Sequence, residues 1–192
     1  MFDLVEVPAE HSHERFVPVT FKGDAWDFSH LKTFAFKVEL EGIGVTDVVV
    51  LFSCHCFTHS FKWDDRPRAA IPADEIYDDG AEQRVLDPVR YAWSQNLLRT
   101  MVHELPQRKI IVANDEQRNF MTWQRQSAAG VEETYAVFFD VEKDKHRGRR
   151  LLLRIQSAYV LDNGLSRRQR EAKKVGWHTL LKAAHEGRKI KP

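Results

Sequence analysis

The sequence predicts an α+β fold in which a mainly antiparallel sheet of about six or seven strands packs against two main helices. Two observations support this class. Short segments that alternate apolar and polar residues recur along the chain, as in half-buried strands. Two longer segments, one starting at Asp87 and one around Arg170, instead place apolar residues three or four positions apart, as in amphipathic helices.

We expect one domain over residues 1–192, because 192 residues with 43% hydrophobic content can bury a substantial core. Residues 1–15 are expected to form a flexible arm and residues 187–192 a basic tail. No run of about 18 apolar residues is present, and the N-terminal stretch is acidic, so we expect neither a membrane span nor a signal peptide. These features predict a cytoplasmic protein with no membrane partner.

The first third of the chain is expected to contain a short strand and then a hairpin. A short strand over residues 17–21 precedes a turn at Gly23 and Asp24. Residues 34–40 then alternate as in a half-buried strand, and Gly42 and Gly44 connect them to residues 45–52, which are apolar on both faces as in an interior strand.

The segment from residue 87 carries clear helix signals. Asp87 is expected to cap the helix, with Pro88 at its first position. Trp93, Leu97, Met101 and Leu105 recur at intervals of four, and Pro106 ends the pattern. The sequence therefore predicts a helix of about 17 residues, followed by strands over 109–113 and 119–125 that are joined by a polar turn.

Residues 134–162 are expected to form the centre of the sheet. Two apolar runs, 135–141 and 151–160, flank a charged segment that contains Gly148, as in a long-looped antiparallel hairpin. Strict alternation in the second strand would place Arg154 on one face and Ser157 with Tyr159 on the other. A single second helix is expected around Arg170, with Gly187 as its C-cap.

The heptad at residues 53–59 has the unusual sequence SCHCFTH. Thiolate and imidazole are preferred zinc ligands, but no second cysteine pair exists, so we predict no bound metal and no cofactor. If the heptad continues the preceding strand, Cys54 and Cys56 share one face, too far apart for a disulfide, and His55 lies on the other face. Buried packing of the cysteines is favoured, and His55 or His59 remains a candidate for catalysis or binding.

The charge is unevenly distributed. Residues 1–142 carry 14 basic and 24 acidic residues, a net charge of −10, whereas residues 143–192 carry 15 and 4, a net charge of +11. Such asymmetry indicates a basic surface for a polyanion, or an acidic surface that meets another partner or folds against the basic part. Both interpretations stay open at this stage.

Nucleotide-binding, zinc-protease and hydrolase motifs such as GxGxxG, HExxH and GxSxG are absent. The histidines, arginines and tyrosines that remain are those a metal-free ribonuclease needs for a base, an acid and cations on the phosphate. The sequence does not decide whether the protein is an enzyme.

Segments across the chain, WDFSHL, LFSCHCFTH, RVLDPVRYAWS, YAVFFDV, IQSAYV and KIKP, resemble small bacterial proteins labelled stationary-phase growth adaptation proteins. A weaker resemblance is to the barnase and RelE-type ribonuclease toxins, in which a strand of a small antiparallel sheet leads into a short Thr/Ser-x-Tyr element. Ser157, Ala158 and Tyr159 match that element.

We therefore expect an RNA-binding protein, with metal-independent endoribonuclease activity of toxin type as a further hypothesis. In this hypothesis His55, His59 and Tyr159 transfer protons, and Arg84, Arg154 and Ser157 bind the substrate. The alternative is a non-catalytic protein-interaction module or antitoxin-like regulator whose acidic part meets a basic protein partner.

Overall fold

A computed structural model of the chain describes residues 6–8, 15–112, 119–126, 132–146 and 150–190. The predictions on most of the N-terminal arm, on the turn before residue 119, on Gly148 and on the last two tail residues lie outside these ranges. No helix in the described part of the chain is long and apolar enough to cross a membrane.

The described residues form an eight-stranded sheet with the order β1-β4-β5-β12-β11-β10-β9-β13. Its strands are β1 (Val7–Pro8), β4 (Phe34–Leu40), β5 (Gly44–Phe52), β9 (Ile110–Ile111), β10 (Asn119–Gln126), β11 (Glu132–Lys143), β12 (Arg150–Val160) and β13 (Lys174–Val175). Neighbours pair antiparallel except β5 and β12, which are parallel. The predicted hairpin of β11 and β12 does occupy the middle of the sheet.

Two smaller sheets complete the strand content of the described residues. One pairs β2 (Val19–Phe21) with β3 (Asp24–Trp26). The other has the order β6-β8-β7 and consists of β6 (Thr58–His59), β7 (Ile76–Asp78) and β8 (Gln83–Leu86). The α+β class is therefore confirmed, whereas the expected number of strands is not. The short strands β1, β6, β7 and β13, of two or three residues each, show no alternating pattern, so the sequence did not reveal them.

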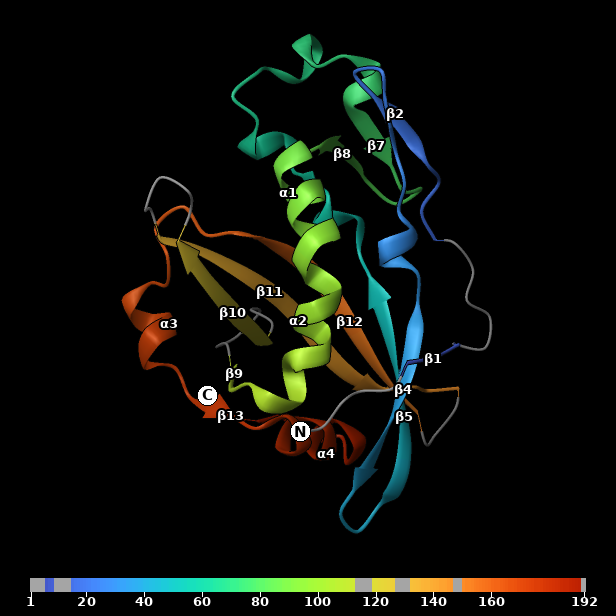
Figure 1. Cartoon of the computed structure of the whole chain (residues 1–192), viewed down its shortest axis with the longest axis vertical. Helices are drawn as coiled ribbons and strands as arrows, with labels where there is room; N and C mark the ends of the chain where they lie inside the picture. The colour runs from blue at the N-terminus through green and yellow to red at the C-terminus, as the bar shows by residue number, and fades with distance from the viewer. Residues whose placement is uncertain (1–5, 9–14, 113–118, 127–131, 147–149, 191–192) are drawn as a thin grey trace.

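The helix predicted from residue 87 forms as expected. It consists of α1 (Pro88–Trp93), a π-helical segment (Ser94–Leu98) and α2 (Arg99–Glu104), and its cap Asp87 accepts hydrogen bonds from the backbone N–H groups of Val89 and Arg90. In Figure 1 this helix crosses one face of the sheet, and the β6-β8-β7 sheet lies beyond its N-terminal end. Leu98, Met101 and Leu105 are buried in the main core together with the facing residues of the sheet.

The prediction of a single helix around Arg170 is wrong, because the structure divides this segment into two helices separated by a strand. The structure has α3 (Arg167–Glu171), the edge strand β13 and then α4 (Trp177–His185). Lys174 and Val175 pair with β9, and Gly176 is the N-cap of α4. The long-range pairing with β9 takes precedence over the local helical pattern. The C-cap of α4 is Glu186, so the prediction of Gly187 as the C-cap is wrong by one residue; Gly187 follows the cap with φ of +67°, the left-handed conformation that commonly ends a helix.

Candidate functional site

The unusual heptad lies where β5 leaves the main sheet. The backbone N–H of Ser53 donates to the carbonyl of Ile155 (3.0 Å), and residues Cys54–Cys56 then form a 3-10 turn capped by the Ser53 side chain. The expectation that the strand continues through the cysteines is therefore wrong. Cys54 and Cys56 are free thiols with 1% and 0% exposure, which confirms that they are buried, and His55 is half-buried.

His55 forms a close pair with Glu82, a residue 27 positions later in the turn between β7 and β8. His55 Nε2 lies 2.5 Å from Glu82 Oε1, and Arg84 Nη1 donates to Glu82 Oε2 at 3.1 Å. The hydrogen bond from His55 and the contact with Arg84 lower the pKa of Glu82. Glu82 thus joins two residues that the sequence predicted as site residues, His55 and Arg84.

Arg84 is 8% exposed and is also bound on its other side. Its Nε donates to Thr58 Oγ1 at 2.8 Å, and Thr58 is itself fully buried. The guanidinium therefore contacts protein groups on both sides in this structure, and an incoming phosphate would compete with Glu82 for it.

The same turn presents a second carboxylate to the cysteine. Cys54 Sγ donates to Asp79 Oδ2 at 3.2 Å, while Asp79 Oδ1 accepts from the backbone N–H groups of Ala81 and Glu82. Burial and the Asp79 carboxylate raise the pKa of Cys54 to about 12. Cys54 is thus a neutral thiol at pH 7 in the structure as it stands.

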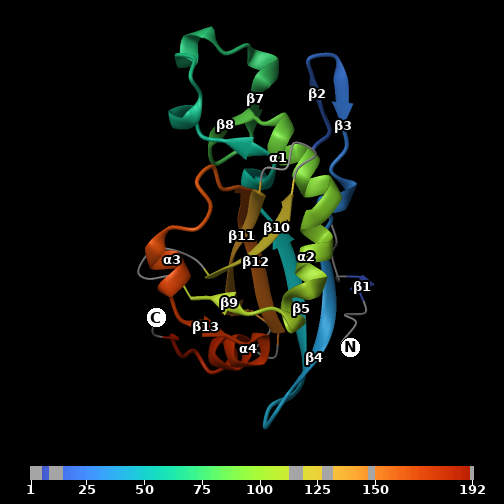
Figure 2. The ribbon, with the colours of Figure 1, turned by 60° about the vertical axis from the view of Figure 1, so that its left-hand side comes forward.

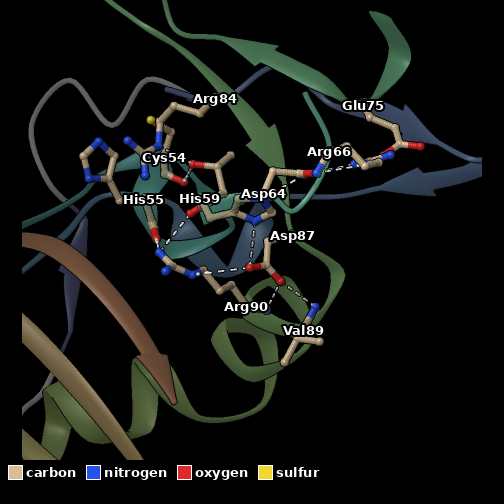
Figure 3. Close-up of polar contacts among 11 residues, drawn as sticks. Cys54, His55, His59, Asp64, Arg66, Glu75, Arg84, Asp87, Val89 and Arg90 are labelled. Atoms are coloured by element: carbon tan, nitrogen blue, oxygen red, sulfur yellow. Dashed lines mark hydrogen bonds and ion pairs between the residues drawn. The ribbon is translucent and has the colours of Figure 1, made fainter. Parts of the chain in front are cut away.

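His59 lies in a neighbouring network (Figure 3). Its Nδ1 is 3.2 Å from Asp87 Oδ2, and its Nε2 is 3.2 Å from Asp64 Oδ2. The hydrogen bond to Asp87, aided by Asp64, raises the pKa of His59 against the opposing effect of burial. Asp64 is in turn held by Arg66, which also pairs with Glu75. With a carboxylate on each ring nitrogen, His59 bridges two acids.

Arg90 connects these groups to the central sheet. Its Nη1 donates to the carbonyls of His55 (3.2 Å) and Thr58 (3.0 Å), and its Nε lies 3.4 Å from Asp87 Oδ2. The guanidinium carbon is also 4.6 Å from the centre of the Tyr159 ring. Arg90 therefore connects Tyr159 to the turn that carries His55.

The other predicted residues of β12 lie on an open face of the sheet. Phe138 pairs with Ser157 but Phe139 pairs with Ile155, so Gln156 is an extra residue in a β-bulge. The bulge places Ser157 and Tyr159 on the same face as Arg154, which corrects the expectation that they lie on opposite faces. Arg154 Nε donates to Glu142 Oε1 at 2.7 Å.

The sequence alone did not indicate Asp79, Glu82 or Arg90 as members of the site. The two acids are in a loop that is rich in Asp and Glu, where no spacing marks them, and only the fold brings them to the heptad. Arg90 follows the helix cap by three positions, so its inward orientation depends on how α1 sits against residues 55–58. No local pattern could have identified these residues.

These features define an α+β protein in which a cluster of Cys, His, Glu and Asp lies at the junction between the main sheet and a small three-stranded sheet. A family model, the YjaZ family, matches residues 18–185, and the chain belongs to that family. No curated protein and no solved structure matches the chain.

Proposed function

We propose that this protein binds single-stranded RNA through an exposed basic segment, residues 166–174. The segment contains five cations and one acid, a net charge of +4: Arg167, Arg168, Arg170, Lys173, Lys174 and Glu171. All six side chains are exposed: four are on α3, Lys174 is on the edge strand β13, and Lys173 lies between the two elements. Clustered, exposed cations are the electrostatic signature of a surface that contacts phosphates.

The position of the acidic residues supports this proposal. Residues 58–87 carry eight acidic and four basic residues, a net charge of −4, and form the β6-β8-β7 region. Figures 1 and 2 both show this region at one end of the molecule, well away from α3. Two cations of the C-terminal region, Arg167 and Arg188, pair with acids near them in the sequence, Glu171 and Glu186, rather than with this acidic region. The distance of the acidic region from α3 supports a basic surface there.

The salt dependence of RNA binding tests this proposal. Each phosphate contact contributes a slope of about −0.7 to a plot of log K against log salt concentration on a single strand. Replacing Arg167, Arg168 and Arg170 together with alanine is expected to reduce that slope by about 2 and to weaken binding at about 50 mM salt. Fluorescence anisotropy with a labelled oligouridylate measures both quantities.

A matched control is available in Arg108, which pairs with Glu104 four residues before it just as Arg167 pairs with Glu171 four residues after it. Arg108→Ala should leave the affinity unchanged, whereas Arg167→Ala alone should weaken it. Absence of binding by the wild type at about 50 mM salt, or equal effects of the two variants, would contradict the assignment to α3.

RNA cleavage is the further part of the proposal and rests on the toxin resemblance. His55 is the better candidate base, because it pairs with Glu82 and its side chain is 26% exposed, against 18% for His59. Tyr159, Arg154 and Ser157 remain proposed acid and substrate contacts. Incubating total RNA with the protein in EDTA should give cleavage that His55→Ala abolishes. Equal cleavage by both proteins would remove His55 from the reaction.

A second candidate function, a protein-interaction module, is favoured by one observation. Trp63 is 71% exposed within the acidic region, and exposed tryptophans often anchor protein interfaces. If neither RNA binding nor cleavage is found, an acidic surface with an aromatic anchor for a basic protein becomes the preferred function.

A further inference from the structure

We infer that Cys54, His55, Glu82 and Asp79 form a zinc site. The ligand atoms of Cys54, His55 and Glu82 all lie within 4.8 Å of one another. Two ligands of a tetrahedral zinc ion are separated by about 3.3–3.8 Å, given bond lengths of about 2.0–2.3 Å. The cluster is thus close to the size that coordination requires. The inference of a zinc site does not depend on the proposed RNA binding.

Asp79 is the fourth ligand in this proposal; its carboxylate lies beside Cys54 but outside the group of three close ligand atoms, so it has to move toward the ion. Its Oδ2 is 3.2 Å from Cys54 Sγ, close to the separation of two zinc ligands. One sulfur, one nitrogen and two carboxylate oxygens make a donor set that suits zinc better than calcium or magnesium, which prefer oxygen alone. Binding replaces the thiol proton, which leaves to solvent as the thiolate coordinates the ion.

The outer contacts of the two carboxylates support this assignment. Asp79 Oδ1 is held by two backbone N–H groups, which leaves Oδ2 directed at the cysteine. Glu82 Oε2 is held by Arg84, which leaves Oε1 directed at His55. Metal sites commonly orient their ligands through such second contacts. The Arg84 cation also balances part of the negative charge of the one thiolate and two carboxylates.

The chain can adjust to the ion with small movements. His55 Nε2 and Glu82 Oε1, now 2.5 Å apart, must separate by about 1 Å to reach the tetrahedral spacing. Their side chains are 26% and 45% exposed, so neither is locked in the core. The ion would tie the turn after β5 to the turn between β7 and β8, two segments that are far apart in the sequence.

The set of ligands proposed here is not the set considered from the sequence. There, only the cysteines and histidines of residues 53–59 were candidates, and the absence of a second cysteine pair argued against a metal. Cys56 is completely buried in the core, and His59 is directed to Asp64 and Asp87. The missing second cysteine pair is therefore replaced by two carboxylates from a distant turn. The site also competes with the cleavage hypothesis, because a histidine nitrogen that binds zinc cannot accept a proton.

Cobalt substitution tests the site directly. Purified reduced protein, stripped of metal, should bind one equivalent of Co²⁺ and show the near-ultraviolet charge-transfer absorption of a cobalt–thiolate bond. Cys54→Ser should abolish that absorption, whereas Cys56→Ala should retain it. Zinc added to the wild type should displace cobalt and raise the melting temperature, because a ligand that binds only the folded state stabilises it.

Glu82→Gln is a second test variant. Because Glu82 is exposed on a turn, its replacement should leave the fold intact. It is expected to weaken zinc binding by about 10–100-fold or more, the cost typical of losing even an outer contact of a metal ligand. Glu39→Gln, an exposed carboxylate on β4, should bind zinc like the wild type. No stoichiometric cobalt binding, or an absorption that depends on Cys56 rather than Cys54, would overturn the inference. RNA binding through α3 is measured separately and would be unaffected.

Discussion

Replacing Trp177 with alanine is expected to lower the free energy of unfolding by about 3–5 kcal/mol, the usual cost of removing a large buried aromatic. Trp177 is the first residue of α4, is 1% exposed and lies with its ring 6.1 Å from that of Phe36 on β4. Because domains of this size are stable by only about 5–15 kcal/mol, the variant should have a much larger unfolded fraction. Urea unfolding followed by circular dichroism measures the change.

Trp177→Phe separates packing from polarity. The indole Nε1 is buried and has no hydrogen-bond acceptor among the described residues. Phenylalanine loses volume but also removes that unpaired donor, so the cost should fall to about 1 kcal/mol. Val45→Ala, at a position that is 63% exposed, should stay within about 0.5 kcal/mol of the wild type. A similarly small effect for Trp177→Ala would show that α4 contributes little to the core.

Replacing Asp87 with alanine should cost about 3 kcal/mol, because three contacts are lost together. The carboxylate caps α1, worth about 1 kcal/mol, and it also partners His59 and Arg90. Removing one member of a partly buried charge network leaves the others uncompensated, which is the costly part. Asp87→Ser should recover the cap but not the charge, and Ser166→Ala, which removes the exposed cap of α3, should cost only about 1 kcal/mol.

The effect of Asp87→Ala should depend on pH. The pKa of His59 is raised in the folded state, so its stabilisation is complete below its unfolded value of about 6.5 and is lost as the pH rises through the folded value. Burial raises the pKa of Asp87, but the hydrogen bond from His59 and backbone contacts lower it overall, so its contribution disappears as the pH falls below about 4. The variant should therefore differ most from the wild type between about pH 4 and 6.5. A difference that grows above pH 8 would contradict this network.

The elements that the sequence predicted well have local causes. The helix from Pro88 follows from its cap and its apolar spacing, and the hairpin of β11 and β12 follows from two strongly apolar strands. The bulge at Gln156 was not predictable, because a one-residue shift in pairing leaves no mark in the sequence of one strand. The α3–β13–α4 division was also missed, since β13 forms only through its pairing with β9.

The candidate site shows the same limit. The sequence indicated Cys54 and His55 because their types are uncommon and close together, and the structure keeps them in one turn. Their partners Asp79 and Glu82 lie 25 and 27 residues away. Nothing in a loop with many acids distinguishes the two that the fold brings to the heptad. Contacts of this kind are decided by tertiary packing rather than by local pattern.

The two margins of the eight-stranded sheet affect how copies of the chain behave at high concentration. Both edge strands as described, Val7–Pro8 and Lys174–Val175, are only two residues long. Pro8 has no backbone N–H to donate, and Lys174 adds an exposed charge to the opposite edge. Each of these two short strands therefore offers few backbone groups with which a strand from another molecule could pair, so strand addition at these two positions is disfavoured.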